Sequence, residues 1–180
     1  LMPGPEITYQ SYGYGWANLS NTPFRLFKQY DHEGGIHTPM IAHWPKGIRA
    51  RGTTTGTLSH LVDLMPTILD ATGIKPAEKS GGAKRIAWDG RSILPSLQGE
   101  KQPDPAVLFF HHARGKAIRA GNWKLVFNKD GKKKAEWELY DLGKDPNELN
   151  DLAKDHPGRV RELAKLWNGR ERNQLTRASK

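Results

Sequence analysis

Residues 117–127 read AIRAGNWKLVF, and this stretch decides the fold of the C-terminal half of the chain. Two runs of strand-forming residues flank Ala120-Gly121-Asn122, a sequence that is typical of a tight turn. Within the second run, large apolar residues alternate with others, which places them on one face of a strand: Trp123, Leu125 and Phe127. The stretch therefore predicts two antiparallel strands that share an apolar face.

Further strands are predicted on either side of this pair. Residues 107–110 form a short apolar run that reads as a strand. Beyond a second turn at Asp130-Gly131, Trp137 and Leu139 alternate with polar side chains. Together these segments predict a small antiparallel sheet.

A C-terminal helix is predicted from about residue 156 to residue 174. Asp155 is a good N-cap, and Pro157 suits the first helical turn. The apolar residues follow the spacing i, i+3, i+4 and i+7 and form a single stripe: Val160, Leu163, Ala164 and Trp167. We expect this stripe to pack on the sheet.

The N-terminal half has a different pattern. Residues 61–73 predict a helix, with Pro66 in its first turn and Gly73 as its C-terminal cap. Residues 39–44 read as a short buried strand. Residues 3–24 are rich in Gly, Pro, Asn and Ser and predict a long loop. The order of elements is that of an α+β protein, or of the tail of a larger α/β protein.

Residues 75–90, rich in Lys, Pro, Gly and Ala, predict a domain boundary. We expect residues 1–90 to be the end of an α/β domain and residues 91–180 to be a separate antiparallel-sheet subdomain. The chain opens on LMPGPE, without the charged and apolar regions of a signal peptide. We expect it to be part of a longer protein.

Composition excludes some classes of protein. The chain has 180 residues with a mean hydropathy of −0.72, and no segment approaches the roughly 20 apolar residues of a membrane-spanning helix. It contains no Cys, which excludes disulfides, thiolate zinc sites and a cysteine nucleophile within this chain. The net charge is +9, and residues 91–180 hold 19 of the 28 basic residues. That surplus fits either a polyanionic partner or a solvated basic surface.

The segment with the most candidate functional side chains surrounds Gly34-Gly35, where the backbone can turn sharply. Five polar side chains converge on this turn: Lys28, Asp31, His32, Glu33 and His37. Such a turn could hold an anion, although the residue types alone also fit solvated or paired side chains. No His, Asp and Glu spacing here makes a metal site.

A second candidate is His111-His112, at the end of the strand that begins at residue 107. With Arg114 and Lys116 nearby, these histidines could contact an anionic substrate, or they could simply end the strand in polar residues. Serines such as Ser20 lack a Gly-x-Ser-x-Gly context, so a serine hydrolase is not supported.

Taken together, the sequence resembles the C-terminal portion of the formylglycine-dependent sulfatases, the arylsulfatase family. The resemblance covers nearly the whole chain and rests on four segments in order: residues 14–45, residues 61–73 with 89–92, residues 117–125, and residues 137–153. It implies an alkaline-phosphatase-like α/β fold with a smaller C-terminal antiparallel sheet and a packing helix. It also implies hydrolysis of a sulfate ester by a formylglycine hydrate, with a calcium ion that polarises the sulfate.

The resemblance assigns a catalytic role to one residue of this chain. Lys28 matches the family's lysine that contacts the sulfate and the bridging oxygen, where an ammonium neutralises developing charge. His112 occupies a matching histidine position, but the acidic neighbours found in relatives are absent. We expect His37 and His112 to contact substrate. The nucleophile motif and the Asp-Asn metal pair are missing, so we expect no metal site in this chain and no activity from the chain alone.

The sequence therefore predicts the C-terminal part of a sulfuric ester hydrolase. Its substrate would be a small sulfate ester or a sulfated glycan, and no nucleic-acid or membrane partner is expected. Family analogy suggests a periplasmic or secreted protein. Two alternatives remain: a phosphodiesterase or phosphonate hydrolase on the same scaffold, and a non-catalytic polyanion-binding module.

Overall fold

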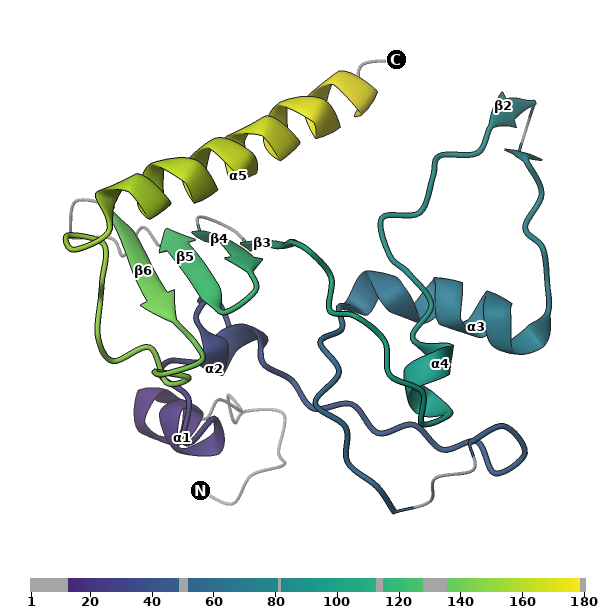
Figure 1. The fold of residues 1–180 in the computed structure, drawn as a ribbon, viewed down its shortest axis with the longest axis horizontal. Coiled ribbons are helices and arrows are strands. Elements are labelled where there is room, and N and C mark those ends of the chain that lie inside the picture. Colours follow the sequence, from purple (N-terminus) through teal and green to yellow (C-terminus); the bar gives the residue numbers. More distant parts are fainter. Residues whose placement is uncertain (1–12, 49–51, 81, 113–114, 128–135, 179–180) are drawn as a thin grey trace, which may run out of the picture. The chain divides into compact units, whose positions relative to one another are not determined.

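The computed structural model describes residues 13–48, 52–80, 82–112, 115–127 and 136–178. They belong to two compact units, of which the first joins Leu1–Pro39 with Val107–Lys180 and the second is Met40–Ala106 (Figure 1). The boundary expected near residue 90 concerns the domains of a longer protein and stays a prediction. Among the described residues, no helix is both long and apolar enough to span a membrane.

The first unit is built on a four-stranded antiparallel sheet in the order β3-β4-β5-β6. Its strands are β3 (Leu108–His112), β4 (Gly115–Ala120), β5 (Trp123–Phe127) and β6 (Trp137–Asp141). In the register, Leu125 lies opposite both Ile118 and Leu139. The strand order follows the chain, and the predicted sheet is confirmed. The turn predicted at Asp130-Gly131 lies outside the described residues.

Helix α5 (Pro157–Ala178) packs on one face of this sheet (Figure 1). All four residues of the predicted apolar stripe contact the core, and Leu163 and Trp167 are buried. Between helix and sheet lies a core of buried side chains: Ile118, Leu125, Leu139, Leu163 and Trp167. Both the helix and its packing face are as predicted, because a single apolar stripe fits only one partner surface.

The other face of the sheet has a different character. A small apolar cluster of Ala117, Val126 and Tyr140 lies there. Lys124 is on the same face as Val126, since the side chains of a strand alternate. This second face contacts the segment that contains α2 (Glu33–Ile36), on the side of the sheet away from α5 (Figure 1).

Part of the long loop predicted over residues 3–24 is wrong. Gly13–Ser20 forms helix α1, although it buries no residue. Its C-terminal turn is closed by side-chain amides: Asn18 donates to the carbonyl of Tyr14 and Asn21 to that of Ala17. A Gly- and Asn-rich segment is thus helical here, although side-chain bonds of this kind are also typical of turns. Residues 3–12 lie outside the described part of the chain.

The second unit contains the helix predicted over residues 61–73. It consists of a 3-10 turn η1 (Leu61–Asp63) followed by α3 (Leu64–Thr72), and it ends at Gly73 with φ +67°. Left-handed backbone of this kind favours glycine at a helix C-terminus. A short hairpin of β1 (Lys79–Ser80) and β2 (Ala83–Lys84) and the helical turn α4 (Leu94–Leu97) complete the unit.

Asp63 ties this helix to the segment that follows the hairpin. Its buried carboxylate accepts hydrogen bonds from the backbone N–H groups of His60 and Arg91, both at 2.8 Å. Thr67 continues the link, since its hydroxyl accepts from the N–H of Ile93. These contacts explain why residues 61–73 and 89–92 occur together as one of the four sequence segments.

The buried strand predicted over residues 39–44 is wrong. The structure has no strand there, and the side chain of Ile41 is 95% exposed. A buried strand needs neighbouring strands for its backbone hydrogen bonds. The strands described in this unit, β1 and β2, pair only with each other, so the apolar run has no sheet to join.

Candidate functional site

The Glu33-Gly34-Gly35 turn forms the start of α2 and is the centre of the candidate site. Its backbone lies unusually close to the preceding loop, and the N–H of Gly34 donates to the carbonyl of Arg25 at 3.1 Å. A Cβ on Gly34 would collide with the carbonyl oxygens of Arg25 and Leu26. A Cβ on Gly35 would collide with the carbonyl of Tyr30. Both glycines are therefore required by close backbone packing rather than by turn flexibility alone.

Lys28 lies in the middle of the loop that packs on this turn. Its side chain is exposed, and none of the described residues forms a hydrogen bond or ion pair with its ammonium. The backbone around it is constrained, because Leu26 and Gln29 both have positive φ values and Tyr30 donates to the carbonyl of Phe27. The loop therefore presents the ammonium of Lys28, which has no partner among the described residues, from a constrained backbone.

A buried ionic cluster lies beneath the turn. The ammonium of Lys124, on β5, is 2.6 Å from Glu33 Oε1 and 2.8 Å from Glu148 Oε1. Glu148 also accepts a hydrogen bond from the backbone N–H of Glu33 at 2.7 Å. Burial on its own would raise the pKa of Glu33, but the charges and hydrogen bonds of Lys124 and His37 together outweigh it and lower that pKa.

Next to this cluster, Arg25 connects the loop to β6. Its guanidinium donates to the hydroxyl of Tyr140 and lies 3.2 Å from Glu138 Oε2. Glu138 also pairs with His32 at 2.8 Å and accepts from Tyr140 at 2.5 Å. Burial opposes ionisation of Glu138, but these hydrogen bonds and charges prevail and lower its pKa to about 2. Burial and the adjacent carboxylate raise the pKa of Tyr140.

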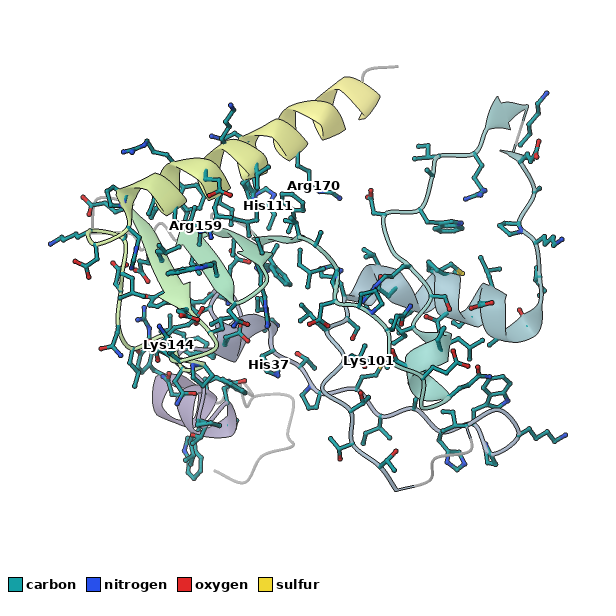
Figure 2. The ribbon with its side chains drawn as sticks, viewed as in Figure 1. His37, Lys101, His111, Lys144, Arg159 and Arg170 are labelled. Carbon is teal, nitrogen blue, oxygen red and sulfur yellow. The ribbon has the colours of Figure 1, made fainter. Side chains whose placement is uncertain are left out.

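His37 lies at the end of α2, and Figure 2 shows it projecting away from the sheet. Its Nδ1 is 2.8 Å from Glu33 Oε2, and its ring stacks on Phe24 with centroids 4.4 Å apart. Half of the side chain remains exposed (51%). Glu33 therefore orients both His37 and Lys124 with its two carboxylate oxygens, which leaves the outer edge of the imidazole for solvent or a ligand.

His111 and His112 end strand β3 on opposite faces. His111 packs edge-on against Trp167 of α5. Figure 2 shows His111 on the helix side of the sheet. His112 is exposed and pairs in register with Gly115. Asp31 is buried, and its carboxylate lies so close to Gly115 that a Cβ there would collide with it. His112 is thus brought to the same region as the loop that carries Lys28.

The charge of Asp31 is poorly compensated. Its Oδ2 has no hydrogen-bond partner among the described residues. Burial raises the pKa of Asp31, opposed in part by the positive charges of His112, Lys124, His111 and His32. Asp31 and His112 therefore interact electrostatically.

Lys28 and His37 thus lie before and after one turn, and His112 interacts electrostatically with Asp31 of the loop that precedes it. Sequence reasoning missed the residues below them: Arg25, Lys124, Glu138 and Glu148. A signal existed for Lys124, because it alternates with large apolar residues on β5 and shares a face with Val126. Glu148 gave no signal, since it comes from a loop and its position depends on tertiary contacts. Among the described residues, no three His, Asp or Glu side chains are arranged to hold a metal ion.

The chain is similar to proteins of a known family. The family model for the C-terminal domain of N-sulphoglucosamine sulphohydrolase matches residues 24–172. A sulfatase of Schizosaccharomyces pombe is 33% identical over 159 residues, which are 87% of this chain and 28% of that protein. The chain therefore spans less than a third of the length of this relative.

Two solved structures are similar to the chain. Ps i-CgsB in complex with k-i-k-neocarrahexaose is 25% identical, with a TM-score of 0.63 over 84% of this chain and 33% of that one. BT4656 in complex with its substrate D-glucosamine-2-N,6-O-disulfate is 27% identical, with a TM-score of 0.50 over 72% of this chain and 27% of that one.

Proposed function

This chain belongs to the sulfatase family, whose C-terminal domain it matches, and we propose that the protein containing it hydrolyses a sulfate ester. The observation that carries the proposal is the family match, which begins at residue 24 and so includes the loop around Lys28. The resemblance noted in the sequence and the expected alkaline-phosphatase-like fold, with its small sheet and C-terminal helix, are confirmed.

In this proposal Lys28 is the catalytic residue of the chain. Its ammonium would contact a sulfate oxygen and the bridging oxygen, and would neutralise the negative charge that develops as the sulfur–oxygen bond breaks. Two observations support the role: the side chain is exposed, and no described residue pairs with its charge. A lysine already held in an ion pair would be less available to an incoming sulfate.

His37 and His112 would contact the remainder of the substrate. The outer edge of His37 is exposed, while its inner nitrogen is held by Glu33. His112 is exposed and interacts electrostatically with the buried carboxylate of Asp31. Both side chains can therefore present hydrogen-bond donors to sulfate or sugar oxygens.

Other parts of the machinery are expected outside these 180 residues. A formylglycine would supply the nucleophile and a calcium ion the charge that polarises the sulfate. The chain has no Cys and no Ser-x-Pro-x-Arg motif. Its described residues also offer no group of three metal-ligating side chains, so neither group fits here and no step is assigned to them.

We propose a sulfated sugar or another small sulfate ester as the substrate class. The disulfated glucosamine bound to BT4656 belongs to that protein, and it supports the class without fixing the sugar. The net positive charge of the chain is compatible with an anionic substrate, because opposite charges attract and raise the rate at which the two meet.

The test uses the full-length protein, produced with formylglycine maturation. Turnover of an aryl sulfate and of sulfated mono- and oligosaccharides is compared with turnover of a phosphate diester and a phosphonate monoester. We expect sulfate esters to be preferred, and Lys28→Ala to lower kcat/KM by about a hundred- to a thousandfold, as for other oxyanion donors. Preference for the phosphorus esters, or an unchanged kcat/KM in the variant, would reject the proposal.

A further inference from the structure

One residue holds both ends of the loop that carries Lys28. The guanidinium of Arg25 donates to the carbonyl oxygen of Glu148 at 2.8 Å, and the backbone N–H of Glu33 donates to its carboxylate at 2.7 Å. Lys28 lies between these two anchors. Glu148 is itself fully buried and has a positive φ of 58°. Its two hydrogen bonds show that its carbonyl and its carboxylate both contact this loop.

Lys124 holds Glu148 and Glu33 together. Its ammonium is fully buried on the second strand from the sheet edge and is within 2.8 Å of a carboxylate oxygen from each. The ammonium donates a hydrogen bond to Glu33 and forms an ion pair with Glu148, whose Oε1 has no hydrogen-bond partner among the described residues. One positive charge thus holds the two carboxylates on either side of it. The ammonium of Lys124 therefore connects the sheet with both the turn that carries Glu33 and the loop after β6 that carries Glu148.

Stability does not explain this arrangement. Removing a lysine and two carboxylates from water costs several kcal/mol per charge, and apolar side chains of similar volume are often neutral or stabilising replacements. The neighbours of Lys124 on this face are apolar or aromatic, namely Ala117, Val126 and Tyr140. Apolar side chains in place of all three charged residues would suit such a face. What an apolar side chain could not do is fix the orientation of the turn.

We propose that Lys124, with Glu33 and Glu148, is a positioning cluster for Lys28, so that the C-terminal sheet sets the geometry of sulfate-ester recognition without touching the substrate. This inference rests on the proposed role of Lys28. It predicts that a change at Lys124 affects catalysis through the loop, and that the effect disappears when Lys28 itself is absent.

The first test is a double-mutant cycle in the full-length protein with an aryl sulfate as substrate. Lys124→Met is expected to lower kcat/KM by about ten- to a hundredfold, mostly through kcat, because Lys28 would be displaced from the transition state. In the Lys28→Ala background the same change should cost less than about twofold. The matched control is Lys154→Met, an exposed lysine of the same unit, which should leave activity unchanged. Equal losses in both backgrounds would overturn the proposal.

The second test does not depend on activity. Hydrogen–deuterium exchange of the peptide covering residues 24–37 should increase in Lys124→Met, while the half of α5 packed on the sheet keeps its protection. Unchanged exchange in that peptide would overturn the positioning role, even if sulfatase activity were established. Increased exchange with no sulfatase activity would instead reject the proposed function and leave the cluster as the anchor of the loop.

Lys124→Met leaves two buried carboxylates without a counter-charge and could prevent folding. Glu148→Gln is therefore measured in parallel. Its amide oxygen can still accept from the N–H of Glu33, but it no longer carries the charge opposite Lys124. We expect the same pattern with smaller effects: lower kcat, faster exchange over residues 24–37, and a loss that vanishes in the Lys28→Ala background. An additive loss or unchanged exchange would count against the cluster.

Discussion

The guanidinium of Arg25 donates a hydrogen bond to the main-chain carbonyl of Glu148, 123 positions later in the chain. In the sequence, the second unit, Met40–Ala106, lies between these two residues and is inserted between the two parts of the first unit. The N-terminal segment and the C-terminal sheet are therefore one structural unit. The candidate catalytic loop depends on residues from the far end of the chain.

Leu163 is expected to anchor α5 to the sheet. Its side chain is fully buried against β4 and β5, whereas Leu166, three residues later on the same helix, is 45% exposed. Leu163→Ala should lower the free energy of unfolding by about 2–5 kcal/mol, because it leaves a cavity in the core. Leu166→Ala should change it by less than about 1 kcal/mol. Chemical denaturation of both variants checks this, and equal losses would contradict the packing.

Gly34 is expected to tolerate no side chain. Gly34→Ala would push a Cβ into two carbonyl oxygens of the loop, at a cost of at least about 1–3 kcal/mol. Gly169, inside α5, has no atom within 4 Å of its Cβ position, so Gly169→Ala should stabilise by about 0.5–1 kcal/mol. Thermal unfolding of the two variants should shift in opposite directions. A stabilised Gly34→Ala variant would mean that the loop does not pack as described.

Glu138 is expected to make folding sensitive to acid. Its folded pKa of about 2 lies below the ordinary 4.5, so its ionised form stabilises the fold above pH 4.5. That contribution is lost as pH falls from 4.5 toward 2. The side chain is 35% exposed, so solvent screens part of the effect.

Glu138→Gln should therefore be less stable than the native chain at pH 6, with a difference that narrows at lower pH. Urea unfolding between pH 6 and pH 3 measures this. A difference that stays constant across that range would show that the charge of Glu138 is not the cause.

Asp31 is expected to behave in the opposite sense. Burial raises its pKa above the ordinary 3.8, so the ionised carboxylate opposes folding, and this cost grows as pH rises through the folded pKa. Asp31→Asn should then be at least as stable as the native chain at pH 7. Asp155→Asn, at an exposed site, is the matched control. A melting temperature that falls equally at pH 7 and pH 3 would disprove this account.

Much of the first unit could be predicted because its signals are local. Alternation along residues 123–127 and the stripe from Val160 to Trp167 each record which side of an element faces the core. The helix over residues 61–73 was predictable for the same reason, with Gly73 as its cap. Two predictions were wrong because local pattern was not enough to decide them. Residues 39–44 are apolar but have no neighbouring strand to pair with. Residues 13–20 were predicted as loop but form α1, in which side-chain amides bond to the backbone.

For the candidate site, the sequence identified the turn but not its support. Lys28, His37 and the Gly34-Gly35 pair lie within one short segment and resemble a known motif, so they could be named together. The assignment of Lys28, His37 and His112 to substrate remains a proposal. The pairing of Lys124 with Glu33 spans 91 positions, and no spacing rule connects residues that far apart.

The sequence by itself determined the four-stranded sheet, the packing helix and the family, because these follow from periodicity and from motifs read along the chain. Only the tertiary structure decided which charges meet. Lys124, Glu33 and Glu148 come from a strand, a turn and a loop, and their attraction becomes strong only when folding removes water around them. Electrostatic partners in a protein interior are chosen by distance and burial, and both are properties of the folded chain.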